Sequence, residues 1–129
     1  MKRFAMFLAV SLIAIGLNFV TTGQVSARPE YKAKIEELTK NSKGADAIKE
    51  AKCNVCHYGK SKKNRNDFGQ ALNKHMNEET YKSMKSDKEA LGKKVEEVLK
   101  TVLKEKSKSG KTFGELIDSG SLPAENPAE

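Results

Sequence analysis

Both cysteines of this 129-residue chain lie in the segment AKCNVCHYGK, residues 51–60, three positions apart. His57 follows the second cysteine directly. Residues at positions i, i+3 and i+4 share one side of a helical turn, so Cys53, Cys56 and His57 can act together. The chain has no other cysteine to form a second pair.

Four interpretations of this cluster compete. Cys-x-x-Cys-His is the pattern for covalent haem attachment, in which two thiols bond the vinyl groups and the histidine binds iron. A thioredoxin-like dithiol would follow a strand, and none is indicated before residue 53. A structural zinc site needs four ligands, and only Cys53, Cys56 and His57 or His75 are candidates. A disulfide would close too short a loop to stabilise the chain much. We favour haem c, one per chain, bonded through Cys53 and Cys56.

The composition agrees with a bound cofactor. Aromatic residues make up 6% of the chain and tryptophan is absent, so the side chains alone provide a small apolar core. Small cores usually need a disulfide, a metal or another staple. A haem would supply the missing apolar bulk.

The first 27 residues have the three parts of a secretory signal. Met1-Lys2-Arg3 is basic, residues 4–20 are mostly apolar, and Val25-Ser26-Ala27 offers small residues for cleavage. We therefore predict a signal peptide over residues 1–27 and export to the periplasm or an equivalent bacterial compartment. An uncleaved membrane anchor is the alternative. Cleavage would lower the formal charge from +7 to +5 and leave no second apolar run, which argues against stable membrane insertion.

The remaining sequence predicts an all-α fold of four to five helices around the haem, in one domain over residues 28–123. Residues 124–129 are expected to be a disordered tail. Helical periodicity and capping residues place the helices at 30–41, 45–57, 67–77, 86–106 and 112–118. Asn66 is the expected N-cap of the third, Ser86 with Glu89 forms a capping box for the fourth, and Thr112 with Glu115 forms one for the fifth. Residues 58–66 are expected to be a basic loop.

The third predicted helix offers a face toward the haem. Phe68, Leu72 and His75 follow the i, i+4, i+7 spacing. We expect Phe68 and Leu72 to contact the ring and His75 to be the second iron ligand. Met84 and Met76 are the alternatives for that distal position.

Four basic residues follow the cysteine motif. Positive charge beside an exposed haem edge would steer an acidic redox partner, although an ordinary solvated loop is an equal alternative. No aromatic residues interleave with the charges, which argues against nucleic acid. The sequence is compatible with either a homodimer or a heterodimer. The residues of this predicted docking surface are Lys60, Lys62, Lys63 and Arg65.

The stretch CNVCHYGKSKKNRNDFGQAL, together with TFGELIDSGSLP, resembles the small exported monohaem cytochrome c proteins of planctomycete and anammox bacteria. The similarity covers residues 45–123. It implies haem c, His57 as the proximal ligand, and structural roles for Arg65 and Asn66 at the turn into the third helix. Some members of this group use a third cysteine as distal ligand, and this chain has none.

The resulting functional prediction is an exported electron carrier that is not an enzyme. The alternative is a haem-based module that binds or senses diatomic gases through a weakly held sixth position. A helical interaction protein with a plain disulfide is a more remote alternative.

Overall fold

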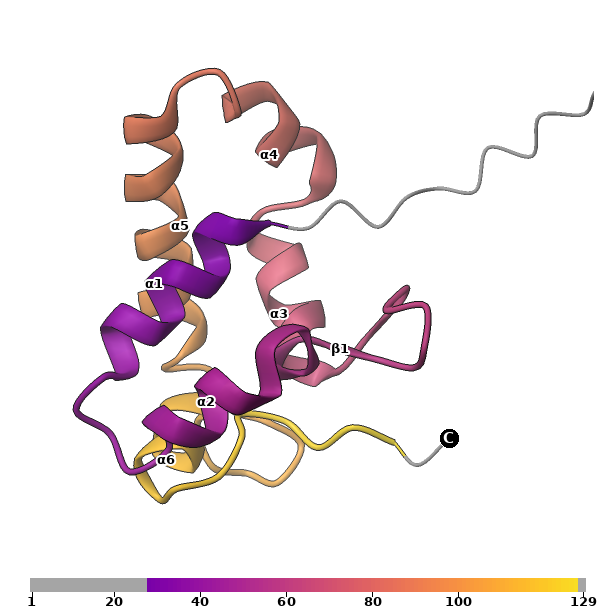
Figure 1. Cartoon of the computed structure of the whole chain (residues 1–129), viewed down its shortest axis with the longest axis vertical. Helices are drawn as coiled ribbons and strands as arrows, with labels where there is room; N and C mark the ends of the chain where they lie inside the picture. Colours follow the sequence, from indigo (N-terminus) through magenta and orange to yellow (C-terminus); the bar gives the residue numbers. More distant parts are fainter. Residues whose placement is uncertain (1–27, 128–129) are drawn as a thin grey trace, which may run out of the picture.

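The computed structural model describes residues 28–127, which are mainly helical (Figure 1). This confirms the helical fold class, while the predicted signal peptide lies outside the described residues. The elements are α1 (Pro29–Thr39), α2 (Ala45–Ala51), the 3₁₀ turn η1 (Lys52–Val55), β1 (His57–Tyr58), β2 (Asn64–Arg65), α3 (Asp67–His75), α4 (Glu78–Met84), α5 (Lys88–Val102) and α6 (Phe113–Asp118).

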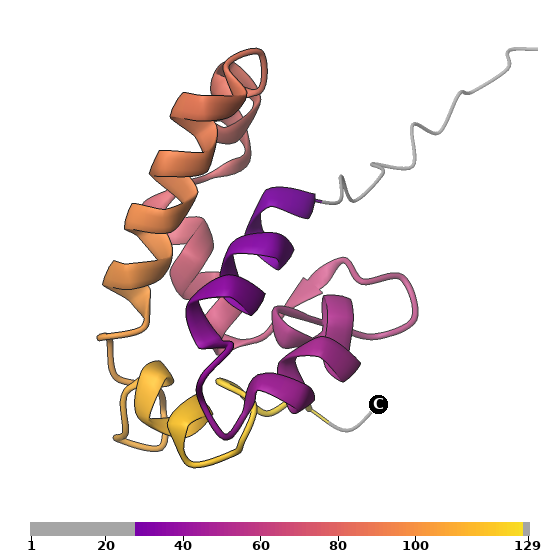
Figure 2. The ribbon, with the colours of Figure 1, turned by 60° about the vertical axis from the view of Figure 1, so that its left-hand side comes forward.

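Helix α5 is the central helix of the fold. Its apolar stripe, predicted from the sequence, is buried at Leu91, Val95, Val98, Leu99 and Val102. Helix α1 packs along it, and α3 and α4 also contact it (Figure 2). The amphipathic pattern thus produces one shared core, since each helix buries its apolar stripe against the same partner.

Two predicted helix starts are confirmed. The Asn66 side chain accepts a hydrogen bond from the Gly69 backbone N–H at 3.0 Å. Thr112 accepts one from the Glu115 N–H at 3.1 Å, and the Glu115 carboxylate accepts one from the Thr112 N–H at 2.7 Å. Both N-caps accept hydrogen bonds from backbone N–H groups that a helix otherwise leaves without a partner.

The start of α5 was predicted one residue too early. Asp87, not Ser86, is the N-cap, and its carboxylate accepts a hydrogen bond from the Ala90 N–H at 3.0 Å. A carboxylate caps as well as a hydroxyl and also complements the helix dipole. The same helix ends at Val102 rather than near residue 106.

Helix α4 was missed. Asn77 caps it by accepting a hydrogen bond from the Thr80 N–H at 2.9 Å, and Tyr81 is buried. Because Asn77 begins this helix, α3 ends at His75 instead of residue 77.

The second predicted helix was too long. Helix α2 ends at Ala51, Lys52 has a φ of 50°, and the chain then makes the η1 turn. His57 and Tyr58 pair antiparallel with Arg65 and Asn64, so the predicted basic loop is the tip of a small hairpin. Strands of two residues carry no visible alternation, which is why the sequence did not indicate them.

The C-terminal segment also differs from the prediction. Ala124 is buried, and the Asn126 amide donates to the Asn54 carbonyl at 3.0 Å. The chain therefore packs on the domain as far as Asn126, where a disordered tail was expected.

Candidate functional site

The Cys-x-x-Cys segment lies on the 3₁₀ turn between α2 and the hairpin. Cys53 is exposed and Cys56 is partly buried, and both are free thiols. The Cys56 N–H donates to the Cys53 carbonyl at 3.2 Å. The two residues thus lie on one turn, although it is a 3₁₀ turn rather than the predicted α-helical one.

Asn66 holds this segment against α3. Its amide donates to the Val55 carbonyl at 3.0 Å and to the Asn126 side-chain oxygen at 2.9 Å. Its backbone N–H donates to the Cys56 carbonyl at 3.0 Å. A single buried asparagine therefore caps α3 and, through hydrogen bonds, fixes the position of the backbone that carries the cysteines.

Gly69 allows α3 to approach the motif closely. A Cβ atom at this position would lie 2.2 Å from the Cys56 carbonyl oxygen. Only glycine permits such an approach between helix and backbone. A glycine within a helical pattern is the only local signal of this contact.

The hairpin orients His57. Its Nδ1 lies 3.1 Å from the Asn64 carbonyl oxygen. A carbonyl can only accept, so this bond fixes a proton on Nδ1 and leaves the Nε2 lone pair for a metal. Burial lowers the pKa of His57, and the charges of Arg65 and Arg28 act in the same direction. The hydrogen bond to the Asn64 carbonyl opposes this shift, and the net lowering favours the neutral imidazole, the form that can bind a metal.

The two thiols differ in environment. Burial raises the pKa of Cys56 to about 12, with a smaller contribution from Cys53. Burial thus favours the neutral Cys56 thiol over the thiolate. Within residues 28–127, no group of three or more His, Cys, Asp and Glu side chains gathers as a metal site.

Among the described residues, no hydrogen bond or ion pair joins Phe68, Leu72 or His75 to the cysteine motif. Phe68 is fully buried and packs edge-on against Phe113 of α6, with ring centroids 5.2 Å apart. Leu72 is buried in the same core. His75 Nε2 pairs with the Glu105 carboxylate beyond the end of α5. The structure places these three residues on one helix but gives His75 a protein partner.

The two methionines, Met76 and Met84, are more buried than His75. Met76 is fully buried at the end of α3, and its carbonyl accepts a hydrogen bond from Arg28 Nη1 at 3.1 Å. Met84 ends α4 and is partly buried against the core.

Sequence reasoning missed a cluster at the start of α1. The Arg28 guanidinium lies 4.8 Å from the centre of the Tyr81 ring and 5.9 Å from that of Tyr31. The Tyr81 hydroxyl donates to the Glu30 carboxylate at 2.5 Å. Residues 28 and 31 meet residue 81 only through the tertiary fold, so no local pattern could have indicated them.

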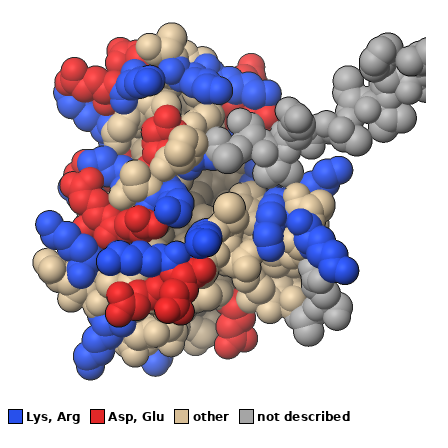
Figure 3. Space-filling view, in the orientation of Figure 1, with Lys and Arg blue, Asp and Glu red and all other residues tan. Residues whose placement is uncertain are grey.

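The hairpin carries the predicted basic surface. Lys60 and Lys63 are exposed, while Lys62 and Arg65 are partly buried. Figure 3 shows Lys and Arg side chains over the hairpin side of the molecule, next to a hollow near the middle of that face. The charges are accessible to a partner.

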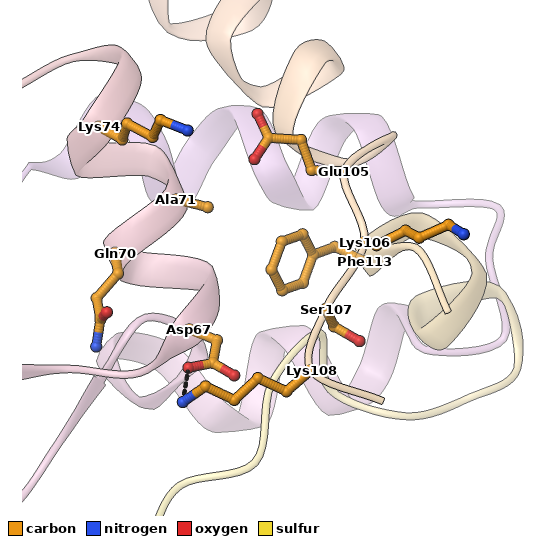
Figure 4. Close-up of a pocket in the computed structure, with 9 residues that line it drawn as sticks. All are labelled: Asp67, Gln70, Ala71, Lys74, Glu105, Lys106, Ser107, Lys108 and Phe113. Atoms are coloured by element: carbon orange, nitrogen blue, oxygen red, sulfur yellow. Dashed lines mark ion pairs between the residues drawn. The ribbon is translucent and has the colours of Figure 1, made fainter. Parts of the chain in front are cut away.

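Two shallow pockets lie elsewhere. One is between α3 and the turn after α5, where Phe113 lies near a 2.6 Å ion pair of Lys108 and Asp67 (Figure 4). The other lies beside Leu38 and Leu103. Neither is lined by Cys53, Cys56 or His57.

No helix within the described residues is long and apolar enough to span a membrane. Comparison with protein-family models, curated proteins and solved structures gave no match.

Proposed function

We propose that this protein is an exported c-type cytochrome that carries electrons through one covalently bound haem. The observation that carries the proposal is the pairing of two free thiols, Cys53 and Cys56, with His57, whose Nδ1 is already engaged by the Asn64 carbonyl. The resemblance to small planctomycete and anammox monohaem cytochromes supports the same conclusion. So does the predicted signal peptide, since haem c is attached outside the bacterial cytoplasm.

The residues fit the chemistry that attachment needs. In attachment, each thiol would add across one haem vinyl group, with sulfur bonding one vinyl carbon and the thiol hydrogen going to the other. His57 would hold the iron through Nε2, and the Asn64 carbonyl, which accepts the Nδ1–H hydrogen bond, would raise the basicity of Nε2. Bound haem would supply an iron centre that cycles between the ferrous and ferric states.

The basic hairpin would act in partner recognition. Lys60, Lys62, Lys63 and Arg65 follow the motif directly, so they would lie beside the haem edge. Charge at this place raises the association rate with an acidic redox protein and is screened by salt. Replacing Lys60 and Lys63 with Gln should slow electron exchange with an acidic partner at low salt and have little effect at high salt.

A gas-binding module is the second candidate. The observation that favours it is the ion pair of His75 with Glu105, which engages the first candidate for the distal position. A distal ligand that is weak or absent would leave iron open to CO or NO.

Visible spectra of the mature protein test the proposal. The protein would be produced with haem-attachment machinery and examined oxidised, reduced, and reduced with CO. Sharp reduced bands that CO does not move support the electron carrier, while a CO-shifted spectrum supports gas binding. Absence of a covalent Soret band would reject both.

Three single variants locate the distal ligand. His75→Ala, Met76→Ala and Met84→Ala should each leave the covalent haem in place. The variant that becomes high-spin and binds CO identifies the ligand. If none of the three changes the spectrum, the distal position has no ligand among these side chains.

A further inference from the structure

The Tyr31 hydroxyl is a buried donor without a partner. The residue is 8% exposed, and its oxygen has no hydrogen-bond partner among the described residues. Leaving a buried hydroxyl unpaired costs about 1–3 kcal/mol. Native proteins rarely accept this cost, so an unpaired group points to a partner other than residues 28–127.

Arg28 adds a cation at the same place. Its guanidinium lies beside the Tyr31 and Tyr81 rings and donates to the Met76 carbonyl. A guanidinium has five N–H donors, so most remain available. Among the described residues it forms no ion pair with a carboxylate.

The nearby acidic groups are already engaged. Glu30 accepts the hydrogen bond from Tyr81, and Glu78 is paired with Lys82 at 2.7 Å. Neither carboxylate takes up the spare donors of Arg28 and Tyr31. The cluster therefore has donors in excess, which suits an external carboxylate.

The cluster and the cysteine motif border the same core, since Tyr31 is part of that core and Cys56 packs against it. Burial raises the pKa of Tyr31 to about 12, and Cys56 contributes to that rise. The Arg28 charge in turn contributes to the lowered pKa of His57. In Figure 3 the surface is hollowed on the side where α1 begins and the hairpin lies.

We propose that Arg28 and Tyr31 form a carboxylate-binding site that holds a propionate group of the haem. The inference rests on the proposed function, because the haem is the carboxylate-bearing group expected beside Cys56. An ionised propionate that leaves water needs charge-assisted donors, and a guanidinium with a phenol provides them. Tyr81, oriented by Glu30, is the aromatic platform under the Arg28 guanidinium.

The test uses the mature holoprotein and its variants Tyr31→Phe and Arg28→Gln. Tyr58→Phe and Arg65→Gln, both in the hairpin, are the matched controls. Resonance Raman spectra report the bending mode of the propionates, which responds to hydrogen bonding at the carboxylate. Redox titration at one pH reports the iron, and the mass of the mature chain checks signal processing in Arg28→Gln.

Tyr31→Phe should shift the propionate mode to lower frequency and favour ferric iron about threefold, because a carboxylate with fewer donors stabilises the higher charge. Arg28→Gln should act in the same direction and more strongly, up to about tenfold, equivalent to about 59 mV. Tyr58→Phe should leave the mode unchanged, and Arg65→Gln should change the potential without moving the mode.

Two outcomes would overturn the inference in distinguishable ways. Covalent haem with an unmoved propionate mode in both variants would reject the carboxylate site and leave the cytochrome proposal standing, even if thermal stability falls. A wild-type protein without covalent haem would reject the proposed function and this site together.

Discussion

The helical scaffold and the cysteine segment are held by different forces. Where α1 meets α5, the contacts are side chains such as Ile35, Val95 and Leu99, which are almost fully removed from water. Residues 52–66 bury few apolar side chains and depend on Asn66 and Gly69 for their position. The scaffold is stabilised by the area it buries, whereas the segment is positioned by a few directional contacts.

This difference separates stability from site geometry. Hydrophobic burial tolerates small shifts, because it has no preferred direction. Hydrogen bonds and backbone approaches do not tolerate them, because their strength falls steeply with angle and distance. Substitutions in the scaffold should therefore affect unfolding, and substitutions around the segment should affect the proposed haem attachment in addition.

The largest effect is expected in the scaffold. Leu99→Ala should lower the free energy of unfolding by about 2–5 kcal/mol, because Leu99 is fully buried on α5. Chemical denaturation of the holoprotein would measure it. Lys93→Ala, on the exposed side of the same helix, should change stability by less than about 0.5 kcal/mol. The contrast between scaffold and segment breaks down if Leu99→Ala abolishes haem attachment under conditions where the protein is folded.

The next effect is at the contact between α3 and the motif. Gly69→Ala should cost about 3 kcal/mol and reduce the yield of covalent haem, because its Cβ would collide with the Cys56 carbonyl. Gly92→Ala is the matched control, since nothing lies within 4 Å of the added Cβ. It should stabilise α5 by about 0.5–1 kcal/mol. Equal effects of the two substitutions would show that the close approach has no role.

Removal of the Asn66 side chain should have a smaller effect on stability. Asn66→Ala loses the cap of α3 and the bond to Val55, at about 2 kcal/mol. Asn77→Ala removes only an exposed cap, at about 1 kcal/mol. Haem content per folded protein should fall in the first variant alone. The segment is not held by Asn66 if both variants attach haem equally well.

The smallest effect at neutral pH concerns Tyr81. Burial, and then the bond to Glu30, raises the pKa of Tyr81 to about 12 from an ordinary value of 10.0. The stabilising contribution is present below pH 10 and lost as the pH rises toward 12. The same bond lowers the pKa of Glu30 below 4.5, so that contribution is lost as the pH falls below 4.5. Tyr81→Phe should flatten the stability profile at both ends, which thermal unfolding across pH would reveal. A profile parallel to that of the wild type would contradict this assignment.

Local signals in the sequence predicted much of the fold. The stripe of α5 and the caps at Asn66 and Thr112 depend on neighbours within one or two turns, so they are visible along the chain. The hairpin and the η1 turn were not visible, because their elements are too short for a period to show.

The candidate site likewise contains residues that the sequence indicates and contacts that only the tertiary fold reveals. Cys53, Cys56 and His57 are adjacent in sequence and could be named at once, but the Asn64 carbonyl that orients His57 required the hairpin register. Arg28 and Tyr31 stand out only through their contact with Tyr81, which is distant in sequence, and through the Tyr31 hydroxyl, which has no hydrogen-bond partner within residues 28–127. Long-range contacts of this kind leave no local pattern.

The hydrogen bonds that Asn126 forms with Asn66 and Asn54 also bear on the order of folding. They join residues 60 and 72 positions apart in the chain. Closing loops of this length costs chain entropy, which the packed helices between the two ends must first offset. The cysteine turn therefore gains its last restraint only when the rest of the domain is folded. For the same reason it can open locally while the helices stay packed.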